Sequence, residues 1–448
     1  MKKHKSLLIL ILTLALAFAL CSCQSKSQET EEQTETNQST SEIETSSGTD
    51  LSNVGTGSVY TDASDSSHAV IADGETIAYE NISVNKTGDA SGDEADFYGT
   101  NAAVFATNGA NLTLTNSKIV TAGSHANAVF SYGEGTALTI SNSVIETSEN
   151  NSGGIMVTGG GTLNASNLLV TTQGGSSAAI RSDRGGGTMI VTGGSYSSFG
   201  SGSPAIYSTA DVTVSDATLY SGVSQAVVVE GKNSVTLVNV NATGNNTKKN
   251  SKNSDQYQAV MIYQSMSGDA SVGKGVFTMT GGSLTSLNGG MFYVNNTVAE
   301  INLSGVEFVY ATDDFLRIEA AGWGTSGSNG GHVTLNASSQ EFEGVITVDS
   351  ISDLNLYLKD GSVFTGSIDN EGETYIEIED GSKWVLTGDS EVTGLTCSAD
   401  AIDLNGYTLT VNGNIYAEGT ESMGTAIVQS SAAESHSTVQ APSKPGKH

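Results

Sequence analysis

One short part of the sequence brings carboxylates and basic side chains close enough together for acid–base chemistry. Asp313 and Asp314 are adjacent, Arg317 follows Asp314 after two residues, and His332 lies further along the chain. Two neighbouring carboxyl groups can act as acid and base in hydrolysis, and clustered carboxylates can also bind Ca²⁺. These four residues are the candidates for catalysis. We expect no metal and no other cofactor, with Ca²⁺ as an alternative that no ligand set in the sequence supports.

A second group of residues combines aromatic rings with positive charge. Each member directly follows an apolar residue within a short apolar run, and these runs recur along the chain. The group consists of Phe105, Phe130, Arg181, Tyr207, Tyr293 and Arg317. Rings stack on the C–H faces of sugars, and guanidinium groups bind hydroxyls or carboxylates. We therefore predict an outward stripe of ligand-binding residues. The alternative is that inserted loops cover the stripe, or that it only packs one coil on the next.

Four long polar or Gly-rich segments interrupt the recurring pattern and begin at Asp89, Asn245, Ser265 and Ala320. Insertions in repeat proteins often project from one face and carry binding residues. Trp323 lies in the last of them, where an exposed ring would suit a ligand. The alternative for Trp323 is that it packs onto a neighbouring coil.

Short strands of one repeated type must position all of these residues. Clear copies are LTLTNSKI at Leu112, LTISNSVI at Leu138, VTVSDATL at Val212 and FTMTGGSL at Phe277. Strict alternation of apolar and polar residues predicts a half-buried strand, and the following Asn, Asp or Gly tolerates a left-handed turn. Most copies are 20 to 26 residues apart, which is typical of a solenoid with one coil per repeat.

A second apolar run lies about 11 to 14 residues before the turn in each regular coil. Two or three strands per coil, each stacked on its equivalent in the next coil, would build parallel sheets around an apolar interior. The sequence therefore predicts an all-β fold, a right-handed parallel β-helix of about 13 coils over residues 56–417. Asn116, Asn142 and Asn167 are assigned to the turns as a structural ladder.

This repeat resembles the right-handed parallel β-helix group, the pectate-lyase-like superfamily and its adhesin-like, non-enzymatic members. The hydrolases of that superfamily have a His between the paired Asp and an Arg-Ile dipeptide, with an Asn-Thr-Asp upstream. Here His332 follows Arg317 and Ile318, and there is no Asn-Thr-Asp. A fold without its site is weak evidence for activity, so we expect a protein without catalysis. A polysaccharide lyase or glycoside hydrolase remains the alternative.

The first 22 residues have the character of a signal peptide. Lysines at positions 2, 3 and 5 precede an apolar stretch over residues 7–20, which is short for a membrane span. The stretch ends in Leu20-Cys21-Ser22-Cys23, which resembles the lipobox of bacterial lipoproteins with Cys23 as the lipidated residue. We expect the chain to be anchored in a membrane by lipid and to face the exterior, or the periplasm in a Gram-negative source. The alternative is an ordinary secretory cleavage site.

Composition describes the two ends of the chain and excludes some partners. Residues 23–55 are the lipidated Cys and a polar, acidic stretch with few apolar side chains, so we predict a disordered tether there, and a disordered tail over residues 418–448. With 18 basic and 48 acidic residues, the net charge of −30 excludes nucleic-acid binding through a basic patch. Once the leader is removed, Cys397 is the single Cys of the predicted fold, so no disulfide can form within it.

Taken together, these features predict a surface-exposed lipoprotein that acts as a binding or adhesion module for carbohydrate or for a host or partner surface. The competing hypothesis is a passive spacer that contributes only length.

Overall fold

Strands form wherever apolar and polar side chains alternate. In β6 (Asn111–Thr115), Leu112 and Leu114 point into the core while Thr113 points outward. The next coil repeats the pattern in β9 (Ala137–Ser141), where Leu138 pairs in register with Leu112. The period-two pattern of the sequence thus becomes a buried apolar column that runs from coil to coil.

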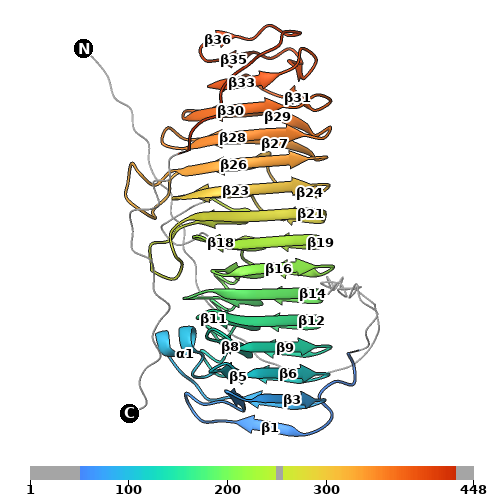
Figure 1. Ribbon diagram of the computed structural model, residues 1–448, viewed down its shortest axis with the longest axis vertical. Helices are drawn as coiled ribbons and strands as arrows, with labels where there is room; N and C mark the ends of the chain where they lie inside the picture. The colour runs from blue at the N-terminus through green and yellow to red at the C-terminus, as the bar shows by residue number, and fades with distance from the viewer. Residues whose placement is uncertain (1–50, 249–255, 430–448) are drawn as a thin grey trace, which may run out of the picture. The chain divides into compact units, whose positions relative to one another are not determined.

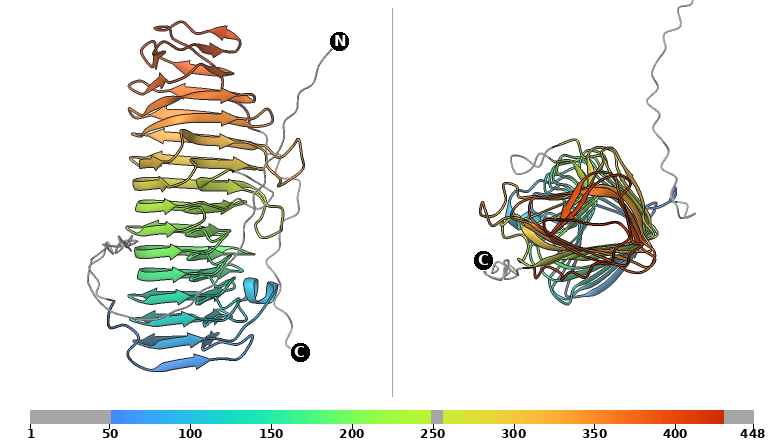
Figure 2. Two further views of the ribbon diagram at one scale, coloured as in Figure 1. Left: turned by 180° about the vertical axis from the view of Figure 1, so that it is seen from behind. Right: turned by 90° about the horizontal axis from the view of Figure 1, so that it is seen from above.

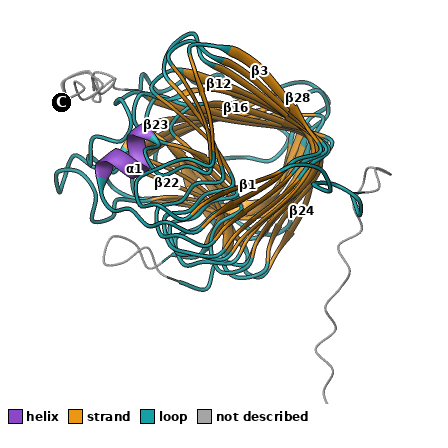
Figure 3. Cartoon of the chain, turned by 90° about the horizontal axis from the view of Figure 1, so that it is seen from below, coloured by secondary structure: helices purple, strands orange, loops and turns teal. Residues whose placement is uncertain are grey.

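The computed structural model describes residues 51–248 and 256–429 (Figure 1). These residues form a right-handed parallel β-helix, as the sequence predicts. One sheet, here called sheet 1, has 14 strands, and these follow one another in chain order along the coils. A second sheet, sheet 2, has 19 strands, because the coils place strands on both sides of a tight corner. Figures 2 and 3 show the coils in further views, with loops outside the strands.

The strands of sheet 1 are β2 (Val70–Asp73), β5 (Val104–Thr107), β8 (Val129–Tyr132), β11 (Ile155–Thr158), β13 (Ile180–Ser182), β15 (Ile206–Ser208), β18 (Val227–Glu230), β20 (Gln258–Tyr263), β22 (Gly290–Asn295), β25 (Asp314–Ile318), β27 (Glu341–Val348), β29 (Val363–Asn370), β31 (Lys383–Leu386) and β34 (Ile402–Asp403). A small third sheet contains β32 (Ser390–Val392), β35 (Leu409–Val411) and β36 (Asn414–Ile415).

Besides β6 and β9, the strands of sheet 2 are β1 (Val59–Asp62), β3 (Thr76–Glu80), β4 (Ser83–Lys86), β7 (Lys118–Thr121), β10 (Val144–Thr147), β12 (Gly161–Thr172), β14 (Gly187–Ser198), β16 (Asp211–Ser215), β17 (Thr218–Ser221), β19 (Ser234–Gly244), β21 (Lys274–Ser286), β23 (Thr297–Ser304), β24 (Glu307–Tyr310), β26 (Gly331–Ser338), β28 (Asp353–Lys359), β30 (Glu373–Ile378) and β33 (Gly394–Cys397).

Left-handed residues make the corner of sheet 2. Asn116, Asn142 and Asn167 have φ angles of 51°, 48° and 51°. The Nδ2 of Asn167 donates a hydrogen bond to Oδ1 of Asn142 over 3.3 Å. Gly193 takes the same corner at φ 67°, and a Cβ there would lie 2.6 Å from Oδ1 of Asn167. The corner residues therefore combine an unusual backbone conformation with contact between neighbouring coils.

Aromatic rings fill the core of the later coils. The rings of Phe342 and Phe364 stack with centroids 4.8 Å apart, and the ring of Phe364 lies 5.9 Å from that of Trp384. Trp384 is fully buried and donates its indole N–H to the carbonyl of Gly366 over 3.0 Å. Cys397 is a free, buried thiol in this core.

Three insertions lie outside sheet 1: the six-residue helix α1 (Asp93–Tyr98), residues 264–273 and residues 320–330. Figure 3 shows α1 outside the strands. Among the described residues, no helix is long and apolar enough to cross a membrane. The predicted leader, Cys23 and most of the predicted tether lie outside the described residues.

Described residues also reach into both predicted end segments. The N–H of Gly55 donates to the carbonyl of Asn116 over 2.9 Å. At the other end, Ser422 forms an isolated antiparallel bridge with Cys397, and Gln429 donates its side-chain amide to the carbonyl of Val333 over 2.7 Å. Residues 418–429 therefore run back along the outside of sheet 2.

Candidate functional site

The aromatic and basic residues of the predicted stripe occupy one column on the outer face of sheet 1. Consecutive coils pair Phe105 with Phe130, Arg181 with Tyr207, and Tyr293 with Arg317. The intervening coils contribute apolar residues to the same column, namely Met156, Val228 and Met261. The column therefore runs without a register shift from Phe105 to Arg317.

The insertion that contains α1 covers the first part of this column. Phe105, 7% exposed, and Phe130, 0% exposed, form an apolar cluster with Met156 and Tyr132, against which Tyr98 of α1 packs. The ring of Phe130 lies edge-on to that of Phe105 at 5.9 Å. The insertion buries almost all of the surface of these two rings, so they do not form an open binding face.

A second apolar cluster covers the later part of the column. Tyr293 is buried with Val228 and Met261, and Tyr207 and Trp323 pack against them. The ring of Trp323 lies 4.8 Å from that of Tyr263, so the insertion over residues 320–330 is folded onto a neighbouring coil. Trp323 therefore covers the stripe.

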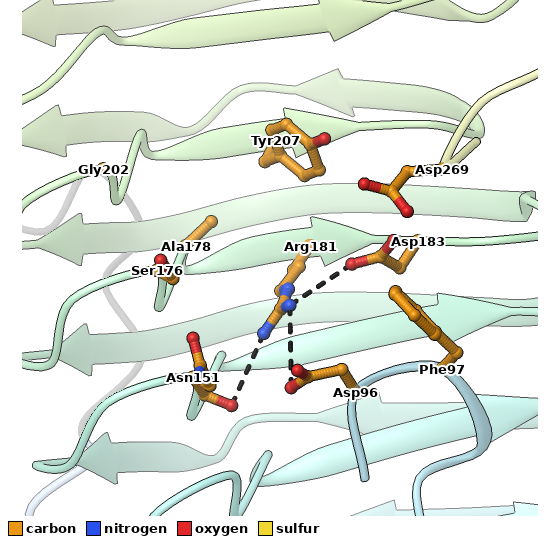
Figure 4. A pocket seen from close by; sticks show the side chains of 10 residues that line it. All are labelled: Asp96, Phe97, Asn151, Ser176, Ala178, Arg181, Asp183, Gly202, Tyr207 and Asp269. Carbon is orange, nitrogen blue, oxygen red and sulfur yellow. Dashed lines mark hydrogen bonds and ion pairs between the residues drawn. The ribbon is translucent and has the colours of Figure 1, made fainter. Parts of the chain in front are cut away.

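A polar pocket of about 340 Å³ opens between the two clusters (Figure 4). Its charged residues come from three places: Asp96 from α1, Arg181 and Asp183 from β13 and the turn after it, and Asp269 from the insertion over residues 264–273. Phe97 and Tyr207 also line it. The full lining is Asp96, Phe97, Asn151, Ser176, Ala178, Arg181, Asp183, Gly202, Tyr207 and Asp269.

Arg181 is held in place by three partners. It is 7% exposed, and its guanidinium donates to Oδ2 of Asp183 over 3.2 Å and to the carbonyl of Asn151 over 3.4 Å. Oδ1 of Asp96 lies 3.8 Å from the same nitrogen that contacts Asp183. Figure 4 shows these contacts as dashed lines. A buried guanidinium between two carboxylates is a rigid group whose charge is already offset.

Asp96 also fixes a histidine at the edge of the pocket. Its Oδ1 lies 2.9 Å from Nδ1 of His125, while Nδ2 of Asn151 lies 2.9 Å from Nε2 of that ring. The Asn amide donates to Nε2, so the ring proton belongs on Nδ1, where it is donated to Asp96. The contacts of Asp96 with His125 and Arg181 thus hold α1 against the outer face of the β-helix.

Arg184 joins the two insertions above the pocket. Its Nε donates to Asp269 over 3.0 Å, and a terminal nitrogen donates to Asp93 of α1 over 3.3 Å. The guanidinium carbon also lies 4.0 Å from the centre of the Phe97 ring. This one side chain therefore sets the distance between α1 and residues 264–273.

Two buried acids give the region an unusual charge state. Burial raises the pKa of Asp183 to about 7, with the charge of Arg181 acting in the opposite direction. Burial also raises the pKa of Glu230, while hydroxyl donors from Ser265 and Tyr207 oppose the shift. The Tyr207 hydroxyl lies 2.5 Å from Oε2 of Glu230, and the Ser265 hydroxyl donates to Oε1. Glu230 therefore fastens the start of the second insertion.

The four fallback candidates for catalysis do not lie in one group, because Asp314 and Arg317 are in contact on sheet 1 while His332 lies on sheet 2. Arg317 donates to Asp314 over 2.7 Å and to Glu319 over 3.2 Å, as in a local ion pair on sheet 1. His332 lies on β26 of sheet 2, where its Nδ1 is 2.5 Å from Asp353. Asp313 precedes β25 on an exposed turn. Within residues 51–248 and 256–429, no cluster of His, Cys, Asp or Glu is arranged to hold a metal ion.

No family model, curated protein or solved structure matches this chain.

Sequence reasoning named Arg181 and Tyr207 but not Asp96, Asp183 or Asp269. Their signal was present, because two of the long insertions contain Asp96 and Asp269, and Asp183 follows Arg181 after one residue. What the sequence could not show is that the two insertions meet over the same coils.

Proposed function

We propose that this protein is a lipid-anchored, non-catalytic binding module, and that the pocket between α1 and residues 264–273 binds carbohydrate. The observation that carries the proposal is the pocket's lining, with the partly exposed ring of Tyr207 beside carboxylates and a guanidinium. Rings suit the C–H faces of a sugar, and the polar groups suit its hydroxyls.

The ion pairs favour an uncharged sugar. Arg181 already faces Asp96 and Asp183, and Arg184 already faces Asp93 and Asp269. A ligand with its own charge would have to separate one of these pairs. Hydroxyl groups can instead use the free lone pairs of the carboxylates and leave the pairs intact.

A glycan array with the mature chain tests the proposal. We expect saturable binding to neutral glycans and at least about a tenfold loss of affinity for Asp269→Asn, because hydrogen bonds to charged groups contribute about 1.5–3 kcal/mol. The matched control is Asp314→Asn, which removes a carboxylate paired with an arginine outside the pocket. An equal loss of glycan affinity in both variants would contradict the assignment of binding to this pocket. If no glycan binds, the hypothesis of a passive spacer is favoured.

The anchor is tested separately from the pocket. With Cys23 lipidated, we expect the chain in the membrane fraction and Cys23→Ala in the medium. Cys21→Ala is the matched control, since it changes the other cysteine of the same motif and should leave the protein on the membrane. Membrane association of Cys23→Ala would refute the anchor.

The pKa of Asp183 near neutrality favours a glycoside hydrolase as a second candidate, because such a carboxyl can serve as a general acid. Its close pairing with Arg181 is equally typical of a structural ion pair. Turnover on a polysaccharide panel that disappears in Asp183→Asn would replace the binding proposal with the hydrolase.

A further inference from the structure

In each regular coil, one strand follows the left-handed corner residue, and these strands stack into a column. This column is interrupted between two coils. β24 pairs with β21 on one side, and residues 341–343 of β27 pair with residues 363–365 of β29. These two segments succeed one another in the column, yet within the described residues no pairing joins them. In earlier coils, β17 pairs with both of its neighbours, β14 and β19. Figure 1 shows β24 and β27 in this part of the helix.

A side-chain amide bridges one end of the interruption. The N–H of Val306 donates to Oε1 of Gln340 over 2.7 Å, and Nε2 of Gln340 donates to the carbonyl of Val306 over 2.8 Å. The same Nε2 donates to the carbonyl of Glu341 over 2.6 Å, and Gln340 is 1% exposed. A primary amide offers the same donor and acceptor as a peptide group. Gln340 therefore takes the place of one peptide group of a strand between the two segments.

The backbone direction follows from this bridge. Successive residues of a strand point their N–H and C=O groups to opposite sides, so Phe308 and Tyr310 share the direction of Val306, toward the interruption. From the opposite side, the carbonyls of Glu341 and Glu343 point back. The Glu343 carbonyl accepts a hydrogen bond from the Tyr310 hydroxyl. Two short strand edges thus face each other, and the interruption ends where the N–H of Val345 donates directly to the carbonyl of Asp313 over 2.6 Å.

Ring positions indicate that the space is one strand wide. Phe342 and Phe364, in adjacent paired strands, stack directly at 4.8 Å. Phe308 and Phe342 are instead separated by Phe315, whose ring lies 5.4 Å from the first and 4.6 Å from the second. Paired strands lie about 4.8 Å apart, so one absent strand leaves a gap of about 10 Å. Phe315 fills the core side of that gap.

The outer side of the gap is open and acidic. A cavity of about 250 Å³ is lined by Phe308, Tyr310, Glu341, Phe342, Glu343, Val363 and Thr365. Glu341 and Glu343 are exposed, and so is Glu307 at the start of β24. A strand placed here would have one row of side chains against Phe315 and the other row beside these carboxylates.

We propose that this gap, hereafter the strand slot, binds an extended peptide of a partner protein by strand addition, with small residues facing inward and Lys or Arg facing outward. Unpaired edges on both sides offer main-chain hydrogen bonds, which is the basis of recognition by strand addition. Phe315 leaves room only for small inward side chains. The three carboxylates favour basic side chains on the outward side of the peptide. The Tyr310 hydroxyl loses its hydrogen bond to the Glu343 carbonyl when the peptide enters.

The probe is a capped synthetic peptide of alternating Ser and Lys, titrated against the full chain. We expect saturable binding and slower amide hydrogen exchange in residues 307–312 and 341–344, with no change in β17. The same peptide with N-methylated alternate amides keeps its charge but loses donors, so we expect its affinity to fall at least about tenfold. Equal binding of the methylated peptide would reduce the effect to surface charge and overturn the proposal.

Two variants complete the test. Glu341→Lys with Glu343→Lys should abolish binding, whereas Glu371→Lys with Glu373→Lys, a charge-matched exposed pair on a later coil, should not. No binding to the full chain, or binding without the two protected segments, would overturn the proposal. Binding that appears only after removal of residues 430–448 would also overturn it, because the chain's own end would then be the occupant.

Discussion

Replacing Asp183 by Asn should make the protein more stable at neutral and alkaline pH and leave it nearly unchanged near pH 4. Burial raises the pKa of Asp183 from 3.8 to about 7. Between these values the folded protein holds a proton that the unfolded chain releases, so unfolding becomes more favourable as pH rises. The stability linked to this proton is complete below about pH 4 and is lost as pH passes about 7.

The size of the effect follows from the shift. One pKa unit corresponds to about 1.4 kcal/mol, so the raised pKa of Asp183 sets an upper limit of roughly 4 kcal/mol at alkaline pH. The Asn side chain has the shape of the neutral carboxyl group and does not titrate. It gives up the charge of the pair with Arg181, which retains Asp96 as a partner. We therefore expect Asp183→Asn to gain about 2–4 kcal/mol relative to the natural chain above about pH 8.

The assay is urea unfolding followed by far-UV circular dichroism at several pH values between about 4 and 9. The difference between the two proteins isolates Asp183, since the raised pKa of Glu230 contributes with the same sign to both. Asp400→Asn, at an exposed position, controls for the change in net charge. A difference that stays constant with pH, or a variant that is less stable at pH 8, would refute the assignment of the raised pKa to burial of this carboxyl.

Three further changes probe the scaffold. Asn167→Ala should cost about 1–2 kcal/mol because its φ of 51° is unfavourable for Ala, and Asn167→Gly should cost less, as measured by urea unfolding. Trp384→Ala should cost about 3–5 kcal/mol and increase hydrogen exchange in the last coils first, because the ring is fully buried. Asp62→Ala should cost about 3 kcal/mol by leaving the buried Lys86 ammonium without its carboxylate, whereas Asp62→Ala on a Lys86→Met background should cost far less.

The coil architecture was predictable because it depends on local alternation. The segments LTLTNSKI and LTISNSVI each predict which side chains are buried and where the chain turns. Leu112 pairs with Leu138, as this pattern requires. The position of the corner residue follows less directly from the sequence where the alternation of apolar and polar residues weakens. In the coil of β26 the left-handed residue is Ser339, because the strand continues to Ser338.

The exposure of the stripe was not predictable in the same way. The column position of Phe105 follows from the repeat, but its burial depends on Tyr98 and α1, which enter between two coils. Similarly, Asp96 and Asp269 approach the same pocket from segments more than 170 residues apart. No local pattern encodes such a meeting, since it is decided by how each insertion packs on the common outer face.

In a solenoid with equivalent coils, a distinctive site must arise where the repeat is irregular. Asn81 and Asn116 are 35 residues apart, and this stretch contains α1. The corners at Asn239 and Gly281 are separated by 42 residues, which include the insertion that supplies Asp269. The coil that follows Gly305 is again long, and it contains the interrupted column. The longest repeat spacings thus mark the pocket and the strand slot, and spacing irregularity is the signal in this sequence that points to candidate sites.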